Sequence, residues 1–322
     1  MNGRDIRSRN IPEETLKQIA SDNTSGAAEI LRQAGAAFTQ LSASTPPVAE
    51  LDQAQQAILD TCTGLALAQP EMTPVLRLAS TALSASRMAS DARDALKYAE
   101  VAALNFIENA ARAAGSASDH SAVLIQEGAS VLTHSRSSTV LAAFVEARRA
   151  GRSFSVIVTE SRPMLEGRAV AASLVVEDIA VTLIADAAAS LAIDQVDLVM
   201  IGADTITPLN LINKIGTRLI ALAARERGVP LFAVSDSSKF IREDYFRGEI
   251  RRFRDPCELW RDAPARVSVV NSYFESTPID WFDGIVTEHG VLSTAEATQR
   301  AMDAAIDLAL AEALRVSLEG IK

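Results

Sequence analysis

The feature that most constrains the fold is an alternation of two kinds of segment in the second half of the chain. From Ala129 onward, short apolar stretches rich in β-branched residues are separated by alanine-rich segments that suit helices. The stretches expected as strands are residues 131–133, 154–158, 181–184, 196–201 and 230–234. The segments expected as helices are residues 139–150, 168–177, 185–191 and 213–227. Apolar strands that alternate with helices indicate a parallel sheet covered on both faces, and right-handed crossovers then produce a doubly wound α/β domain.

The first third of the chain is expected to be helical, because it is rich in alanine, leucine, glutamine and serine and almost lacks β-branched runs. Pro12, Glu13 and Glu14 suit a first helical turn, where proline loses no hydrogen bond and acids meet the positive end of the dipole. That helix is expected to end at residues 22–25, and further helices are expected over residues 26–41, 48–68 and 81–114. The Gly-Ser-Ala-Ser stretch 115–118 is expected to break the last one. We therefore predict a helical domain over residues 1–118 and an α/β domain over residues 119–322.

Composition excludes several classes of protein. The 322 residues suffice for about two domains, and 31 basic against 41 acidic residues give a net charge of −10, which disfavours nucleic acid as a general partner. No apolar run approaches the ~20 residues that cross a bilayer, and the polar N-terminus lacks the apolar stretch of a secretory signal. Cys62 and Cys257 form no disulfide framework, and the three histidines show no metal-ligand spacing. We expect a cytoplasmic protein without a membrane segment, metal or cofactor.

Polar residues follow four of the expected strands. In a doubly wound sheet, the ligand crevice lies beyond the carboxyl ends of the strands. The polar clusters are residues 133–139, 159–163 with 166–167, 202–205 with 213–217, and 235–240. They supply hydroxyl groups, N–H groups at helix starts and cations, all of which bind phosphate. We therefore expect a small phosphorylated ligand, and the lack of a Walker loop or GxGxxG fingerprint disfavours a nucleoside triphosphate or dinucleotide.

Several of these residues also have a purely structural interpretation. Ser137, Ser138 and Thr139 suit helix caps, while Arg162 and Asp204 suit an exposed arginine and a turn former.

Two further positions, Lys214 and His134, leave the same choice open. Lys214 would lie in the first turn of the expected helix 213–227, where a cation opposes the dipole, and a residue placed against local preference indicates function. His134 is either part of the ligand crevice or a core histidine satisfied by backbone groups.

Between Val131 and Lys239 the chain resembles the sugar-phosphate isomerase and initiation factor 2B family, which includes two sugar-phosphate isomerases and the α, β and δ regulatory subunits of the factor. The isomerases are methylthioribose-1-phosphate isomerase and ribose-1,5-bisphosphate isomerase. The matching motifs are VLTHS at 131–135, TESRP at 159–163 with EG at 166–167, and GAD at 202–204 with NKIGT at 213–217. Further echoes are TSGA at 24–27, NSYFESTP at 271–278 and TEHG at 287–290.

The resemblance implies a helical N-terminal domain, a Rossmann-like C-terminal domain and a homodimer. In the isomerase branch, a cyclic aldose 1-phosphate and an open-chain ketose phosphate are interconverted. A cysteine after the Thr-His pair and the aspartate of Gly-Ala-Asp carry the proton transfers, so Ser135 and Asp204 take the catalytic positions here. The residues implied for substrate binding are Arg162, Asn213, Lys214, Ser25, Gly26, Arg136, Ser137, Glu166 and Lys239.

The chain departs from the isomerase pattern at Ser135, where that branch has cysteine. A thiol titrates near ~8.5, whereas an unassisted serine hydroxyl does not ionise near neutral pH. His134 is poorly placed to activate Ser135, because adjacent residues on an extended strand point to opposite faces. The serines and arginine at 135–138 are more similar to the regulatory subunits, which lack the cysteine, yet Asp204 is retained.

Three hypotheses follow from this mixture. The first is a sugar-phosphate isomerase that uses Asp204 as its main acid and base. The second is a non-catalytic regulatory protein that binds a sugar phosphate or a nucleotide. The third is a purely structural partner in a translation factor complex, which would need an exposed apolar patch.

Overall fold

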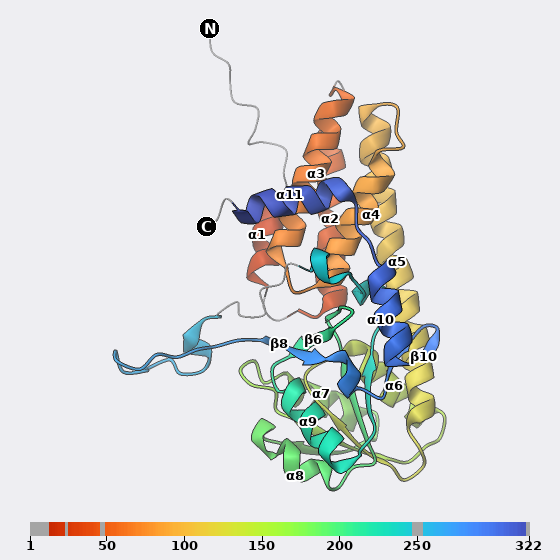
Figure 1. Ribbon diagram of the computed structural model, residues 1–322, viewed down its shortest axis with the longest axis vertical. Coiled ribbons are helices and arrows are strands. Elements are labelled where there is room, and N and C mark those ends of the chain that lie inside the picture. Colours follow the sequence, from red (N-terminus) through yellow and green to blue (C-terminus); the bar gives the residue numbers. More distant parts are fainter. Residues whose placement is uncertain (1–12, 23–24, 46–48, 247–253, 320–322) are drawn as a thin grey trace. The chain divides into compact units, whose positions relative to one another are not determined.

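The computed structural model describes residues 13–22, 25–45, 49–246 and 254–319 (Figure 1). The expectations for Pro12 and Thr24 therefore lie outside the described residues. Contacts divide the chain into two compact units: the residues up to Ala111 together with those from Ala305 onward, and the residues Arg112–Ala304. The C-terminal segment, expected in the α/β domain, belongs to the first unit, where its helix packs on a helix of that unit, because contacts rather than chain order define a core.

The first unit is helical. Its helices are α1 (Glu13–Ser21), α2 (Ala27–Ser44), α3 (Leu51–Ala68), α4 (Thr73–Ser86), the first part of α5 (Ala92–Leu124) and α11 (Leu308–Glu319). The expected helix over residues 81–114 is therefore two helices. The chain turns between them, and the side chain of Asp91 accepts a hydrogen bond of 2.8 Å from the backbone of Asp94 in the first turn of α5.

The expected break at residues 115–118 is wrong, since α5 continues through it to Leu124. The serine hydroxyls do not pull the backbone out of the helix. Ser118 Oγ donates to the carbonyls of Ala114 and Gly115, and Ser121 Oγ donates to the carbonyl of Ala117. Such bonds inside the helix satisfy the hydroxyls locally, so small polar residues are tolerated where the helix is buried.

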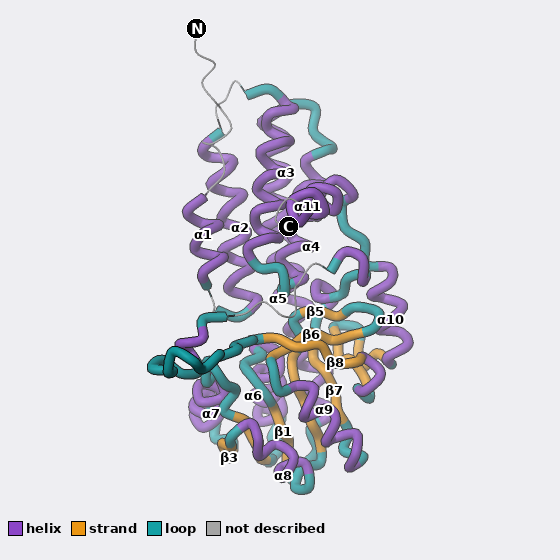
Figure 2. Tube along the Cα trace, turned by 60° about the vertical axis from the view of Figure 1, so that its left-hand side comes forward, coloured by secondary structure: helices purple, strands orange, loops and turns teal. Residues whose placement is uncertain are grey.

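The second unit is built on a seven-stranded sheet with the order β10-β9-β7-β4-β1-β2-β3, shown with the other strands in Figure 2. Its strands are β1 (Ser130–Thr133), β2 (Ser155–Thr159), β3 (Ala180–Ile184), β4 (Leu198–Gly202), β7 (Leu231–Val234), β9 (Gly284–Thr287) and β10 (Gly290–Leu292). All neighbours are parallel except β9 and β10. The predicted doubly wound α/β class is confirmed, and the strand order reverses between β1 and β4, where such folds place their ligand crevice.

Besides the end of α5, the described part of this unit has five α-helices: α6 (Ser138–Arg149), α7 (Glu166–Val176), α8 (Ala189–Ile193), α9 (Thr217–Arg227) and α10 (Thr294–Asp303). The expected helix at 185–191 is a 3₁₀ turn, Asp186–Ala188, followed by α8. None of the helices in the described ranges is long and apolar enough to cross a membrane.

A second, three-stranded antiparallel sheet was not anticipated. It comprises β5 (Thr205–Ile206), β6 (Asn210–Lys214) and β8 (Phe274–Pro278), in the order β5-β6-β8. Asn213 and Lys214 thus end a strand and do not begin a helix, which overturns the argument from the helix dipole. The reason is pairing with a distant segment, since Asn213 lies opposite Glu275 in β8 and α9 begins only after Gly216, whose φ is +110°.

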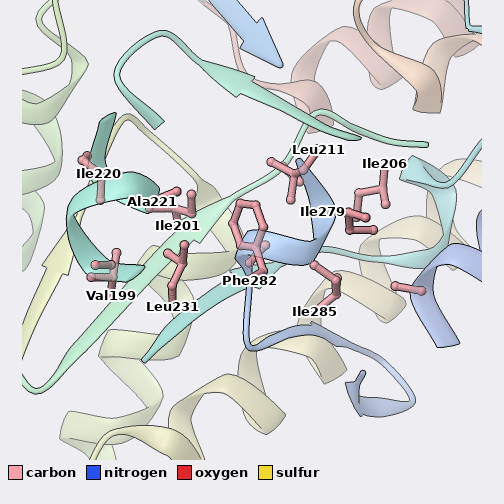
Figure 3. Close-up of a cluster of buried hydrophobic side chains, with 14 of the residues drawn as sticks. Val199, Ile201, Ile206, Leu211, Ile220, Ala221, Leu231, Ile279, Phe282 and Ile285 are labelled. Atoms are coloured by element: carbon pink, nitrogen blue, oxygen red, sulfur yellow. The ribbon is translucent and has the colours of Figure 1, made fainter. Parts of the chain in front are cut away.

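The centre of the main sheet is buried on both faces, whereas β3 at its edge is largely exposed. Successive residues of β4 alternate between two apolar clusters, with Leu198 and Met200 in one and Val199 and Ile201 in the other. Figure 3 shows the second cluster, which also contains Ile206, Leu211, Ile220, Leu231, Ile279, Phe282 and Ile285. Residues of the smaller sheet and of α9 therefore share a core with the main sheet, so the carboxyl ends of the strands and the end of β6 are held in fixed register.

Candidate functional site

The polar residues predicted at the strand ends do come together in the second unit. Hydrogen bonds and close contacts link the segments that follow β1, β2, β4, β6 and β7, as the following paragraphs describe. The site therefore lies beyond the carboxyl edge of the main sheet, with β6 of the smaller sheet contributing one side.

A buried ion pair joins two of the predicted binding residues. Lys214 Nζ lies 2.8 Å from Glu166 Oε1, and the side chains are 4% and 23% exposed. Lys214 also lies over the ring of Tyr273, 5.0 Å from its centroid. The second carboxylate oxygen, Glu166 Oε2, is buried and has no hydrogen-bond partner among the described residues. Lys214 is thus already paired, and Glu166 keeps one buried acceptor without a hydrogen bond beside this ion pair.

We predict strong energetic coupling within this pair. A double-mutant cycle with Glu166→Gln and Lys214→Met should give a coupling free energy of about 1–2 kcal/mol in denaturant unfolding, because either single change leaves the other charge partly buried without its partner. The exposed pair Arg227 and Asp194, 3.0 Å apart, provides the control and should show coupling near zero. Equal coupling in the two cycles would contradict the prediction.

Lys239 contacts the backbone just after β4, next to Asp204 in the sequence. Lys239 Nζ is buried and donates a hydrogen bond of 2.5 Å to the carbonyl of Ala203, the residue before Asp204. The backbone N–H of Asp204 donates to the carbonyl of Ile212 in β6, at 2.9 Å, and its side chain is half-buried. Two hydrogen bonds therefore hold the backbone at Asp204, one from its own N–H to β6 and one from the buried ammonium of Lys239 to the preceding carbonyl.

The loops after β1 and β2 are tied to each other. The backbone N–H of Ser135 donates to Ser161 Oγ at 2.8 Å. Ser135 and Ser161 both adopt left-handed backbone conformations, with φ of +64° and +62°. Non-glycine residues rarely do so, and such strain concentrates at functional sites.

Asp186, which the sequence analysis missed, fixes the second of these loops. Its two carboxylate oxygens accept hydrogen bonds from the backbone N–H groups of Ser161 and Arg162, both at 2.7 Å. The guanidinium of Arg162 is half-exposed and donates to the carbonyl of Leu259 at 3.3 Å. Asp186 is the second residue after β3, so the rule that placed the other clusters at strand ends would have found it had it been applied to the third strand.

His134 is buried and satisfied on both sides. Its Nδ1 lies 2.6 Å from Thr159 Oγ1, and its Nε2 lies 2.8 Å from the carbonyl oxygen of Ile215. Burial lowers the pKa of His134, so the ring is neutral at physiological pH. Both nitrogens are engaged away from Ser135, which agrees with the expectation that His134 is no base for this serine.

Ser137 and Asn213 have structural contacts. Ser137 caps α6, because its Oγ accepts a hydrogen bond of 3.3 Å from the backbone of Val140. Asn213 is buried and donates from Nδ2 to Thr217 Oγ1 at 2.9 Å. Arg136, on the same loop as Ser137, is exposed. Their proposed contacts with a ligand stay predictions.

The N-terminus of α9 already holds an anion. Glu275 Oε1 accepts hydrogen bonds from the backbone N–H groups of Gly216 and Arg218, at 2.6 and 2.9 Å. A carboxylate thus takes the place where a helix start would otherwise offer donors to phosphate. A phosphate group in this site therefore has to rely on other donors.

Ser25 and Gly26 belong to the helical unit. Ser25 donates its backbone N–H to Asp22 Oδ1 at 2.9 Å, and exposed Gly26 is the N-cap of α2. Their predicted part in binding stays a prediction.

Across the part of the chain that the structure describes, no three His, Cys, Asp or Glu side chains group so as to hold a metal ion. The two cysteines are free thiols, Cys62 buried and Cys257 exposed.

The structural class of this protein is defined by two features. The chain combines a helical unit with a doubly wound α/β unit, and polar residues gather beyond the switch point of the α/β sheet. The chain belongs to the initiation factor 2 subunit family, because the profile of that family matches residues 23–294. The resemblance seen in the sequence motifs is thereby confirmed.

Relatives of two kinds share this family resemblance. The ribose 1,5-bisphosphate isomerase of Archaeoglobus fulgidus is 39% identical over 194 residues, which is 59% of this chain and 61% of that protein. The match thus spans about three fifths of the length of this relative. A putative translation initiation factor eIF-2B subunit 2-like protein of Pyrococcus furiosus is 30% identical over 88% of this chain and 97% of its own.

Solved structures show the same fold. The translation initiation factor eIF-2B of Pyrococcus horikoshii OT3 superposes with a TM-score of 0.75 and 26% identity, covering 87% of this chain and 96% of that chain. The 5-methylthioribose 1-phosphate isomerase of the same organism has a TM-score of 0.69 and 23% identity, covering 90% and 87%. The second likeness, at this low identity, concerns the fold alone.

Proposed function

We propose that the protein is a sugar-phosphate isomerase that interconverts an aldose 1-phosphate and a ketose phosphate. The observation that carries the proposal is the position of Asp204, just after β4. Its backbone N–H donates a hydrogen bond to Ile212 in β6, and the preceding residue, Ala203, accepts a hydrogen bond from the buried ammonium of Lys239. Relatives named as ribose 1,5-bisphosphate and methylthioribose-1-phosphate isomerases support this choice of substrate class.

The proposed reaction needs one group that moves protons and several that hold charge. Breaking the bond between C1 and the ring oxygen, with loss of the C2 proton, gives an enol phosphate and a protonated ring oxygen. Return of a proton to C1 and loss of the C2 hydroxyl proton then give the ketose. Asp204 takes the proton from C2 and returns it to C1, while solvent water protonates the ring oxygen and accepts the C2 hydroxyl proton. Arg162 and the Glu166–Lys214 pair hold phosphate and hydroxyl groups. Ser135 contributes a hydrogen bond rather than an ionised nucleophile.

The test is turnover of ribose 1,5-bisphosphate and methylthioribose 1-phosphate, followed by formation of the ketose at high enzyme concentration. We expect measurable turnover by the native chain and faster turnover by Ser135→Cys, since a thiol near ~8.5 supplies an acid that serine lacks. Ser173→Cys, on the exposed side of α7, is the matched control and should leave the rate unchanged. Absence of turnover by both the native chain and Ser135→Cys would refute the proposal.

A second candidate is a non-catalytic regulatory protein that binds a sugar phosphate or a nucleotide. The engagement of both nitrogens of His134 favours it, because no imidazole is then available to activate Ser135. This candidate predicts that ribose 5-phosphate or a nucleoside monophosphate raises the melting temperature without any turnover. For either candidate we propose a homodimer, which light scattering on the purified protein would test.

A further inference from the structure

We propose that His134 is a positioning residue that locks the loops after β1 and β2 to the turn after β6. This inference rests on the proposed function in one respect, because the three segments carry the proposed site residues Ser135, Arg162 and Lys214. It assigns to His134 no contact with substrate and no proton transfer.

A continuous chain of hydrogen bonds runs through the imidazole. A carbonyl oxygen can only accept, so the bond to Ile215 places the proton on Nε2. Nδ1 must then accept from the hydroxyl of Thr159. Thr159 Oγ1 lies 3.2 Å from Ser161 Oγ, which in turn accepts the backbone N–H of Ser135 at 2.8 Å. The tautomer of the ring therefore makes Thr159 the donor to Nδ1, and Ser161 Oγ then donates either to Thr159 Oγ1 or to the carbonyl of Thr159, which lies 3.3 Å away.

The turn after β6 also lies directly against the ring. A Cβ placed on Gly216 would lie 2.8 Å from both Cε1 and Nε2 of His134. The backbone of Gly216 also has a φ of +110°, which side-chain-bearing residues rarely adopt. The close approach and the hydrogen bond to Ile215 together hold this turn against the imidazole, directly after Lys214 at the end of β6.

The electrostatic surroundings keep the imidazole neutral. Burial lowers the pKa of His134 and the charge of Lys214 lowers it further, whereas the hydrogen bond to Ile215 and the charges of Asp186 and Glu166 act in the opposite direction. A neutral ring has one donor and one acceptor, which are the two functions that the turn and the loops require.

Two substitutions separate the two halves of this arrangement. In His134→Gln, the amide nitrogen can still donate to Ile215, but the acceptor for Thr159 is lost. In His134→Asn, the shorter amide oxygen can still accept from Thr159, but it does not reach Ile215. Hydrogen exchange of the full chain, followed by mass spectrometry at pH 7.5, reports the two regions separately.

We expect His134→Gln to raise exchange about tenfold in residues 133–137 and 159–162 and to leave residues 214–217 unchanged, since one hydrogen bond is lost on one side only. His134→Asn should show the opposite pattern. Thr159→Val, which removes the hydroxyl but keeps the shape, should behave as His134→Gln does. The same pattern in both His134 variants, or no change in either, would overturn the inference.

A spectroscopic readout on the native chain remains decisive if a variant fails to fold. The chain has three histidines, so ¹⁵N-histidine labelling gives three imidazoles, with half-exposed His289 as an internal reference. His134 should remain neutral and protonated on Nε2 as the pH falls from 8 to about 6.5, the ordinary value for histidine, because burial lowers its pKa. Protonation of the His134 ring at or above about pH 6.5, or a proton on Nδ1 of the neutral ring, would overturn the inference. Neither readout involves turnover, so failure of the isomerase proposal would not affect them.

Discussion

Asp204→Asn is expected to lower turnover of ribose 1,5-bisphosphate by about a hundredfold to ten-thousandfold, the range lost when a positioned acid or base is removed. Asparagine has the same shape and preserves hydrogen bonding, but it cannot take up a proton. The backbone N–H bond of this residue to Ile212 does not depend on the side chain, so the fold should be retained. Steady-state rates, with the melting temperature measured alongside, check the prediction.

The control for this experiment is Asp280→Asn, which makes the same chemical change at an exposed position in the turn before Phe282. Its turnover should equal that of the native chain. Thermal stabilisation by ribose 1,5-bisphosphate should persist in Asp204→Asn, because phosphate is held by cations elsewhere in the site. Turnover by Asp204→Asn within tenfold of the native rate would remove Asp204 from the proposed catalytic role.

Gly167→Ala is expected to destabilise the protein by about 4 kcal/mol or more, which would unfold many domains. An added Cβ would lie 1.8 Å from the carbonyl oxygen of Thr159 and 2.9 Å from its carbonyl carbon. These atoms belong to the end of β2 and cannot rotate away as a side chain could. The first turn of α7 would have to leave the strand, carrying Glu166 with it. Denaturant unfolding, with the slope as well as the midpoint recorded, measures the effect.

Gly115→Ala provides a matched control, since Gly115 also lies in a helix and an added Cβ there meets nothing within 4 Å. This variant should be stabilised by about 0.5–1 kcal/mol, the helix preference of alanine over glycine. A loss for Gly167→Ala below about 1 kcal/mol would show that α7 can shift from β2 at little cost.

The sequence predicted β1, β2, β3, β4 and β7 to within two residues at each end. Four of these strands, β1, β2, β4 and β7, are mostly buried, and each of the five is a short apolar run that is visible without knowledge of its partners, although β3 at the edge of the sheet is largely exposed. The smaller sheet lacked that signal. Its central strand, Asn210–Lys214, is polar at both ends and is stabilised by pairing with a segment some sixty residues further on.

For the site, the sequence by itself determined where polar groups gather, because parallel topology brings the carboxyl ends of strands to one edge. It also identified the family through motifs whose spacing the fold preserves. It did not determine which of these groups are already engaged. Lys214 is paired with Glu166, and Glu275 fills the start of α9.

The same holds for the loops that the site residues occupy. His134 is engaged by Thr159 and Ile215, while Asp186 holds the loop of Arg162. All of these contacts join residues more than twenty positions apart. Hydrogen bonds and ion pairs act over a few ångströms, so only the tertiary structure decides which polar residues meet. The local sequence determines the strands and thereby the edge of the sheet where polar residues gather. The packing of distant segments determines which of those residues are paired and which groups donate or accept each hydrogen bond.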